Sequence, residues 1–262
     1  MRPEALASAI AEDRKRGFLP VAVVATIGTT STTSIDPVPA IADICEREGI
    51  WLHVDGAYGG SAGIVPELRH YLDGADRADS MVVNPHKWLF TPVDCSVLWV
   101  KDRALLKRAF SLVPEYLVTA ESGDVIDLMD YGVQLGRRFR ALKLWMVIRS
   151  FGTDGLAARI REHVRIAQDF ASWIEAEPDW EIMAPHPFSL ICFRYAPRGR
   201  GEAELTALNQ KIMDTVNASG EAFLSHTKLR GRFVLRLAVG NIRTEEKHVA
   251  RVWELLREAS GR

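Results

Sequence analysis

Two short stretches decide how this sequence folds: residues 53–58, which read HVDGAY, and residues 84–88, which read NPHKW. The first stretch begins within a short, largely apolar run at 50–54, and the second directly follows such a run at 80–83. Apolar runs of this length that end in a polar turn are typical of buried strands in an α/β sheet. We therefore expect Asp55 and Lys87 to lie on turns at the ends of two strands, where they offer a carboxylate and an amine.

The segments around these stretches alternate between strand and helix patterns. Strands are predicted at 19–26, 50–54, 80–83 and 96–100, and helices at 4–16, 38–48 and 103–110. Because strands that alternate with helices form mostly parallel sheets, this part is predicted to be α/β with a largely parallel sheet. The continuous apolar run at 19–26 further predicts a strand that is covered on both faces.

The second part of the chain has a different pattern. Helices are predicted at 137–151, 154–176, 202–218 and 244–258, and short strands at 180–184, 189–195, 222–226 and 232–238. Short strands in succession favour a small α+β domain with an antiparallel sheet. The domain boundary is placed in the long helical region, which gives a large domain at 1–142 and a small domain at 143–262.

Composition excludes several classes of protein. The 262 residues include 33 basic and 34 acidic side chains and have a net charge of -1, which predicts neither a nucleic-acid groove nor a polybasic membrane surface. The apolar runs are too short for a transmembrane helix, and the first residues lack a secretory h-region. The seven histidines are dispersed and predict no metal site. Three cysteines without CxxC spacing indicate reduced core residues of a cytoplasmic protein.

Three polar residues follow three separate predicted strands. Thr30, Asp55 and Asn84 all come just after strand ends, and ligands of parallel sheets bind beyond the carboxyl ends of the strands. A lysine and a carboxylate on opposite sides of one pocket are what pyridoxal phosphate (PLP) requires. The lysine forms the Schiff base, and the carboxylate keeps the pyridine nitrogen protonated. The sequence therefore predicts a PLP site formed by Lys87 and Asp55.

Each residue also has a simpler structural interpretation. Lys87 precedes an apolar segment, 88–90, that would desolvate its amine, but it could equally extend from the edge of the core toward water. Asp55 precedes a glycine and could cap a helix or a turn. His86 could be an ordinary core histidine, while Ser80 and Asn84 could be turn formers.

Five motifs together resemble the group II PLP-dependent amino-acid decarboxylases, the family of aromatic L-amino-acid decarboxylase. They are VATIGTT at 24–30, WLHVDGAY at 51–58, NPHKWL at 84–89, DCS at 94–96 and LGRRFR at 135–140. The resemblance runs over essentially the whole chain. It implies PLP fold type I, with a large α/β domain and a small C-terminal domain, and a homodimer with active sites near the subunit interface.

The resemblance also assigns a role to each site residue. Lys87 would carry the cofactor, Asp55 would pair with the pyridine nitrogen, and Ala57 would lie against the ring. Tyr116 falls where the family has the catalytic tyrosine of a mobile loop, which protonates the Cα carbanion left after decarboxylation. The remaining cofactor residues would be Thr30, which lines the cofactor, Ser80 and Asn84, which reach toward the phosphate, and His86 beside it.

The implied reaction is decarboxylation of an L-amino acid to the amine and carbon dioxide. Aromatic substrates are the family default, although glutamate and histidine decarboxylases share the lysine motif. Because the chains of this family extend much further on the N-terminal side, we expect this chain to be a C-terminal fragment with weak PLP binding and little activity alone. Two alternatives stay open: another fold-type-I reaction, such as aldehyde synthesis or transamination, and a non-catalytic truncated paralogue that pairs with a full-length subunit.

Overall fold

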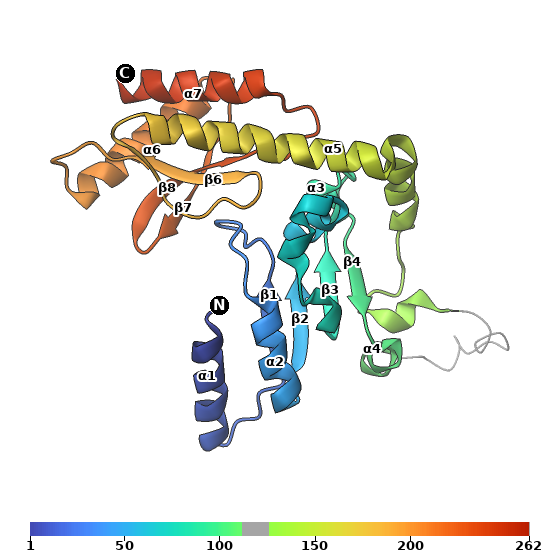
Figure 1. Ribbon diagram of the computed structural model, residues 1–262. Helices are drawn as coiled ribbons and strands as arrows, with labels where there is room; N and C mark the ends of the chain where they lie inside the picture. Colours follow the sequence, from blue (N-terminus) through green and yellow to red (C-terminus); the bar gives the residue numbers. More distant parts are fainter. Residues whose placement is uncertain (112–125, 262) are drawn as a thin grey trace.

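The computed structural model describes residues 1–111 and 126–261, which form two β-sheets joined by a long helix (Figure 1). The first sheet contains the strands β1 (Ala22–Thr26), β2 (Trp51–Asp55), β3 (Ser80–Val83) and β4 (Val97–Val100). Its helices are α1 (Pro3–Lys15), α2 (Val38–Glu48), α3 (Pro85–Trp88) and α4 (Arg103–Phe110). Short 3-10 helices cover Gly59–Ile64 (η1), Pro66–Leu72 (η2), Ala75–Arg77 (η3) and Leu128–Tyr131 (η5).

The first sheet has the order β1-β2-β3-β4. β1, β2 and β3 are parallel, and β4 runs antiparallel to β3 at the edge. Thr26 pairs with Asp55, and Asp55 pairs with Val82, so the carboxyl ends of the three parallel strands meet at one edge. The predicted, largely parallel sheet is therefore confirmed, with one antiparallel strand at its edge.

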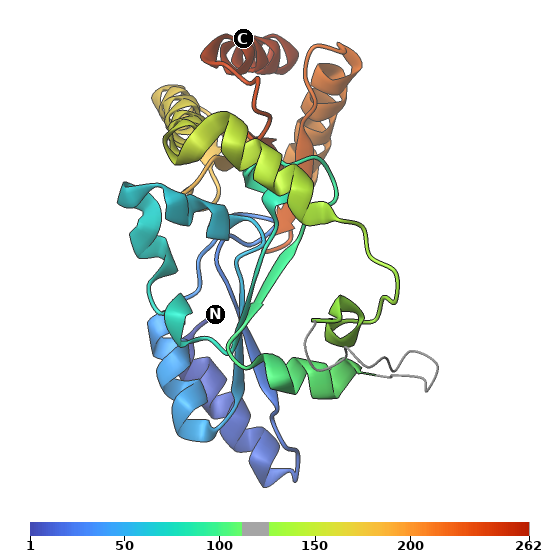
Figure 2. The ribbon, with the colours of Figure 1, turned by 90° about the vertical axis from the view of Figure 1, so that its right-hand side faces the viewer.

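Only one face of this sheet is covered by helices in the described part of the chain. Val23, Ala25, Leu52 and Val54 are buried in a core that includes side chains of α1 and α2, and both helices lie on this side (Figure 2). On the opposite face of β1, Val24 is 51% exposed. The prediction of a strand covered on both faces at 19–26 was wrong. The strand begins only at Ala22, because residues 18–21 form an exposed loop and only alternate residues of β1 point to the helices.

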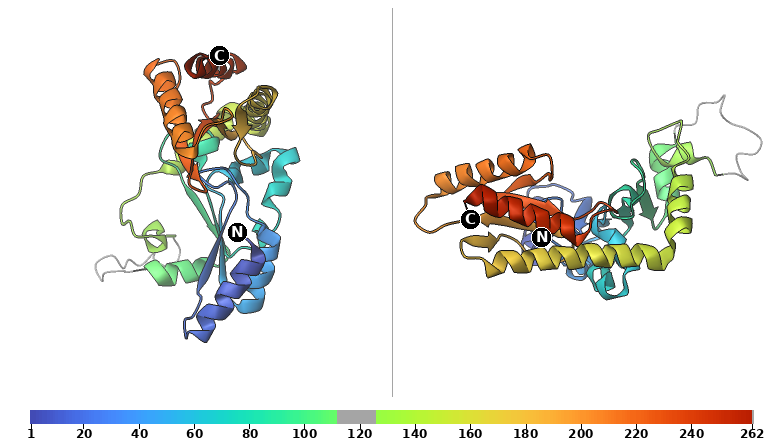
Figure 3. Two further views of the ribbon diagram at one scale, coloured as in Figure 1. Left: turned by 90° about the vertical axis from the view of Figure 1, so that its left-hand side faces the viewer. Right: turned by 90° about the horizontal axis from the view of Figure 1, so that it is seen from above.

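The second sheet is antiparallel, as predicted, and has the order β5-β6-β8-β7. Its strands are β5 (Trp180–Ile182), β6 (Leu190–Tyr195), β7 (Ser225–Leu229) and β8 (Arg232–Ala238). The helices α6 (Glu202–Ala218) and α7 (Glu246–Ser260) and the second half of α5 lie beside this sheet (Figure 3). Their buried side chains form one core with Ile191, Phe193 and Leu235. The strand predicted at 222–226 begins instead at Ser225. The tight turn at Arg230 and Gly231, both with positive φ, sets the position of this hairpin.

The long helix α5 (Arg140–Ala176) joins the two sheets. It consists of two helical segments that meet at Gly152, whose φ of 65° and ψ of 172° are not helical. A glycine adopts this backbone conformation without the steric cost that a Cβ atom would bring. The predicted separation of the helices at 137–151 and 154–176 is thus confirmed, and it falls at Gly152.

The second segment of α5 contributes to both cores. Ala157 and Ile160 pack in the core of the first sheet, and Ile166 and Phe170 pack in the core of the second. Phe188 also belongs to the first core, although it precedes β6. The division of the chain at 142/143 stays a prediction. None of the helices that the structure describes is long and apolar enough to cross a membrane.

Candidate active site

A cavity of about 310 Å³ opens beyond the carboxyl ends of β1 and β2. Both residues of the predicted pair, Asp55 and Lys87, line it. Its wall comes from the strand ends, from a threonine-rich loop and from the small sheet: Thr26, Gly28, Thr29, Thr30, Thr33, Ala57, Tyr58, Leu190, Arg236, Ala238, Val239 and Gly240. The structure therefore places Lys87, Asp55, Ala57 and Thr30 together, as the sequence predicted.

Asp55 is the last residue of β2, and its Oδ1 accepts a hydrogen bond of 3.0 Å from the backbone N–H of Ala57. This local bond turns the chain beneath the carboxylate and leaves Oδ2 for a ligand. The turn continues into η1, where a Cβ atom on Gly59 would lie 2.5 Å from the carbonyl oxygen of Ile27. Only a glycine therefore allows the chain to pass so close to the end of β1.

Lys87 lies on α3, a single helical turn that follows β3 directly. Its side chain is exposed at the cavity, whereas that of Trp88 is fully buried. The expectation that the following aromatic residues desolvate the amine was wrong for this chain. Successive residues of a helix point in different directions, so Trp88 enters the core while Lys87 points away from it.

The loop after β1 bends back at Gly28, whose φ is 85°. The backbone N–H groups of Gly28 and Thr29 both donate to the carbonyl oxygen of Ser34, at 3.0 Å each. These bonds close the loop and hold Thr30 at the cavity.

Arg236 of β8 reaches across from the second sheet and fastens this loop. Its guanidinium donates to the carbonyl oxygens of Thr30 (2.6 Å) and Ser31 (2.8 Å) and to Ser225 Oγ (2.8 Å). The guanidinium thus adds a fixed positive charge to the wall of the cavity. Sequence reasoning missed Arg236, because an arginine on an alternating strand is an ordinary surface pattern.

Tyr58 is the second residue that sequence reasoning missed as part of the wall. Its hydroxyl donates to Ser189 Oγ (2.7 Å), and Ser189 in turn donates to the carbonyl oxygen of Val239 (2.7 Å). Burial raises the pKa of Tyr58, so the hydroxyl stays protonated and acts as a donor. Its position directly after the predicted Ala57 was the only signal that could have drawn attention to it.

The other predicted cofactor residues do not line the cavity. Asn84 caps the end of β3, and its Oδ1 accepts from Ser96 Oγ at 2.7 Å. His86 Nδ1 lies 2.7 Å from the carbonyl oxygen and 3.0 Å from the nitrogen of Cys95. Tyr116 lies outside the described residues.

Ser80 is farthest from the expected position, because it begins β3 and the cavity lies beyond the other end of the strand. Its hydroxyl contacts Trp51 Nε1 (2.9 Å) and His53 Nδ1 (2.8 Å). A direct contact from Ser80 to a phosphate in the cavity does not follow from this geometry.

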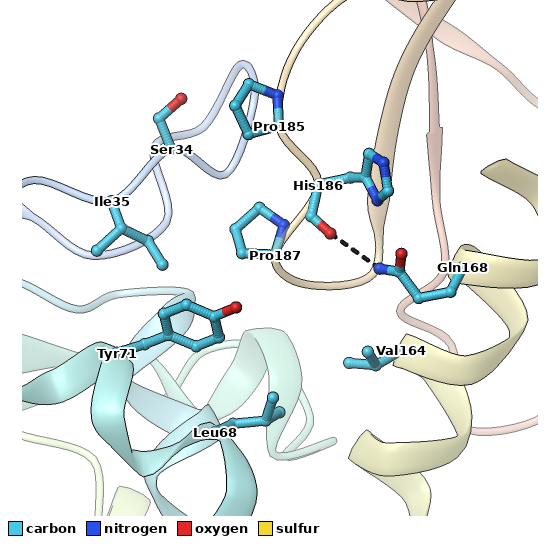
Figure 4. Close-up of a pocket in the computed structure, with 9 residues that line it drawn as sticks. All are labelled: Ser34, Ile35, Leu68, Tyr71, Val164, Gln168, Pro185, His186 and Pro187. Atoms are coloured by element: carbon cyan, nitrogen blue, oxygen red, sulfur yellow. Dashed lines mark hydrogen bonds between the residues drawn. The ribbon is translucent and has the colours of Figure 1, made fainter. Parts of the chain in front are cut away.

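A second cavity of about 770 Å³ lies between η2, α5 and the loop at 185–187 (Figure 4). Tyr71, Leu68 and Val164 form much of its wall, and Gln168 Nε2 donates to the carbonyl oxygen of His186 at 2.9 Å (Figure 4). It contains no lysine or carboxylate. It therefore lacks the groups that PLP chemistry needs, in spite of its size.

The conserved domain of the pyridoxal-dependent decarboxylases matches residues 1–196. The chain belongs to this family. It is 47% identical over 261 residues to tryptophan decarboxylase TDC1 of Camptotheca acuminata, an alignment that covers 98% of this chain and 52% of the relative. It is also 45% identical over 260 residues to phenylacetaldehyde synthase of Arabidopsis thaliana, which covers 98% of this chain and 53% of the relative.

Among solved structures, the chain is similar to Oryza sativa TDC with PLP and tryptamine. The TM-score is 0.95 and the identity 42%, and the match covers 100% of this chain and 55% of the other. The fold of this decarboxylase-family chain is accordingly PLP fold type I. The chain spans about half the length of the relatives that it matches.

The cavity fits PLP, the cofactor of the family, at its reactive end. Lys87, Asp55 and Ala57 bring an amine, a carboxylate and a small side chain to the lining of one cavity. The amine of Lys87 suits the aldehyde carbon, and the carboxylate of Asp55 suits the protonated ring nitrogen. Among the described residues, no group of three His, Cys, Asp or Glu side chains is arranged to hold a metal ion.

Proposed function

We propose that this protein serves PLP-dependent decarboxylation of an aromatic L-amino acid, which yields the amine and carbon dioxide. The observation that carries the proposal is the cavity in which Lys87 and Asp55 come together beyond the ends of parallel strands. The relatives support the choice of substrate, since their names include tryptophan decarboxylases and a tyrosine decarboxylase.

When bound, the cofactor supplies a conjugated ring that accepts the electron pair left as carbon dioxide departs. Asp55 would hold the proton on the ring nitrogen, and its bond to the Ala57 N–H keeps the carboxylate oriented for that task. Lys87 would bind the aldehyde carbon and move protons at the substrate amine. Arg236 places a positive charge in the wall that favours the carboxylate group of an amino-acid substrate.

We keep Tyr116 as the proposed proton donor to Cα, and Asn84 and His86 as proposed phosphate-side residues, whereas Ser80 at the far end of β3 is not kept. Asn84 is the better supported of these two, because it follows the last residue of β3 and immediately precedes the lysine turn. A homodimer in the cytoplasm completes the proposal. Trp145 (57% exposed) and Met146 (54%) on the first segment of α5 suit an interface, because apolar residues exposed side by side mark contact surfaces.

Two experiments test this function. The chain is incubated with excess PLP, reduced with borohydride and digested, and the peptides are mapped by mass; the adduct is expected on Lys87 and absent in Lys87→Ala. Carbon dioxide release is then measured with tryptophan, tyrosine, phenylalanine, dopa, glutamate and histidine, with the chain alone and mixed with a full-length homologue. An adduct on other lysines but not on Lys87 contradicts the assignment.

Aldehyde synthesis is the second candidate, and the phenylacetaldehyde synthase among the relatives favours it. In this family a phenylalanine at the position of Tyr116 goes with aldehyde formation, so the tyrosine supports simple decarboxylation. Tyr116→Phe is expected to lower the amine yield and raise the aldehyde yield. An unchanged amine yield would contradict the role of Tyr116.

A further inference from the structure

His163 of α5 is a buried histidine to which the proposed chemistry gives no role. It is 1% exposed and lies beside the lysine turn, where its Nδ1 is 3.2 Å from the indole nitrogen of Trp88. The ring of Phe90 meets it edge-on, with 5.4 Å between ring centroids. A histidine from a distant helix thus contacts both aromatic residues of the segment that follows Lys87.

Trp88 is the anchor of the lysine turn. It is fully buried, and its ring stacks on Tyr58 with 4.7 Å between centroids and 10° between planes. Phe188 meets the same indole ring edge-on at 5.6 Å. Because Lys87 and Trp88 are adjacent in a helix of one turn, the orientation of the indole also fixes the direction in which the lysine leaves the backbone.

The indole N–H can only donate, so His163 Nδ1 must accept. The imidazole is therefore neutral and carries its proton on Nε2, on the side of the ring that the backbone of Asn241 approaches. Protonation of His163 would set two N–H groups against each other at this contact.

The surroundings of His163 oppose this protonation. Burial is the main cause that lowers its pKa, and the nearby charge of Arg159 acts in the same direction. Glu162 and the backbone of Asn241 act in the opposite sense. The charged groups, Arg159 and Glu162, both belong to α5 itself, while the lysine turn contributes aromatic rings.

We propose that His163 is a positioning residue for Lys87, because by accepting the indole N–H of Trp88 it holds the helical turn that presents the lysine to the cavity. The inference rests on the role proposed for Lys87. It predicts that the acceptor atom is what matters, and that neither the aromatic ring nor the charge of the histidine is needed.

Two variants separate these properties. In His163→Asn the amide oxygen lies near the position of Nδ1 and cannot titrate, so the acceptor is kept. In His163→Leu the acceptor is lost and most of the volume stays. His163→Gln is the matched control, since its amide reaches toward the position of Nε2.

The contact itself is tested by NMR of the full chain labelled with ¹⁵N at tryptophan. The Trp88 indole N–H is assigned as the signal that His163→Leu displaces and that Trp88→Phe removes. In the wild type it is expected to shift as the pH falls below the ordinary histidine value of 6.5, and in His163→Asn it is expected to stay constant. An indole signal that Trp88→Phe removes but that His163→Leu leaves unshifted overturns the inference.

The effect on Lys87 is tested by measuring the rate at which its PLP adduct forms, with borohydride used to trap the adduct. His163→Asn is expected to react at nearly the wild-type rate, and His163→Leu and His163→Gln roughly five- to thirtyfold more slowly, because a buried donor loses its partner. Equal rates in all four proteins overturn the inference and leave the proposed function intact. No wild-type adduct on Lys87 refutes the proposed function and the inference with it. If His163→Leu does not fold, the inference is tested by comparing the adduct rates of His163→Asn and His163→Gln.

Discussion

The two sheets of this protein are buried to very different extents. All six residues of β6 are buried, because helices cover one face of the second sheet and the loop at 29–34 approaches the other. In β4 of the first sheet, Val97, Leu98 and Trp99 are 42%, 49% and 49% exposed. The polar site residue Asp55 is on the less covered sheet, on the face opposite to Leu52 and Val54.

The second sheet therefore contributes mainly to stability, and the first sheet carries the residues proposed for the chemistry. The second sheet has a continuous core, in which substitutions are expected to cost much stability. The first sheet presents its functional groups on an open face. Ligand-binding parts of proteins are commonly drawn from the less stable regions. Stability measurements on matched pairs of residues can therefore contradict or sharpen the comparison.

The largest effect is expected for Phe193→Ala in β6. Phe193 is fully buried and contacts the rings of Phe170 and Trp180, so its removal should lower the free energy of unfolding by about 3–5 kcal/mol. Leu98→Ala in β4 is the control and should cost less than about 1 kcal/mol. Chemical denaturation followed by circular dichroism measures both. Similar losses in the two variants would contradict the comparison of the sheets.

A smaller effect is expected for Asn209→Ala. The buried Asn209 side chain joins α6 to β6 by accepting from the N–H of Tyr195 (2.8 Å) and donating to its carbonyl oxygen (2.7 Å). The variant removes two buried hydrogen bonds between α6 and β6, which should cost about 1–3 kcal/mol. The exposed neighbour Gln210 is the control, and its alanine variant should stay within about 0.5 kcal/mol of the wild type in the same denaturation experiment.

Tyr58→Phe tests the joint between the two sheets. It removes the hydrogen bond to Ser189 and keeps the ring on Trp88, so we expect a loss of about 0.5–1.5 kcal/mol in unfolding free energy. Tyr71→Phe is the matched control, because the hydroxyl of Tyr71 forms no hydrogen bond with the described residues. If both variants lose the same amount, the bond across the joint contributes nothing of its own.

The smallest effect is a dependence on pH. Since burial lowers the pKa of His163 in the folded state, the unfolded chain binds its proton first as the pH falls below 6.5. The contribution of His163 to stability is then complete above pH 6.5 and is progressively lost as the pH falls below it. Denaturation at pH 7.5 and pH 5.5 should show a smaller acid loss in His163→Asn than in the wild type. A larger acid loss in that variant would reverse the sign of this linkage.

Much of the fold could be predicted because it is encoded locally. The helix at 202–218 and the strand at 232–238 match α6 and β8 to the residue, since each has its own periodic pattern. The break at Gly152 was equally local. The strand predicted at 222–226 was misplaced because Phe223 supports a strand pattern, although it is 84% exposed in a loop.

The site could be predicted only where chemistry and strand ends coincide. Asp55 and Lys87 met this condition, and the cavity contains both. Ser80 did not, because it lies at the beginning of its strand. Arg236 could not be found, since its role depends on contacts with residues about 200 positions earlier in the chain.

Gly152 lies between two straight segments of α5 and can act as a hinge, so the segment from Arg140 to Phe151 forms an arm. The segment from Arg140 to Phe151 extends roughly 18 Å from this one non-helical residue, so a rotation of about 10° at the glycine would displace the far end by roughly 3 Å. At that end Arg140 Nε bonds to Asp94 Oδ2 at 2.9 Å, close to the turn that contacts His86. The arm is therefore fastened at its tip to the lysine side of the molecule, while Ala157 and Ile160 on the other side of the glycine are held in the core of the first sheet.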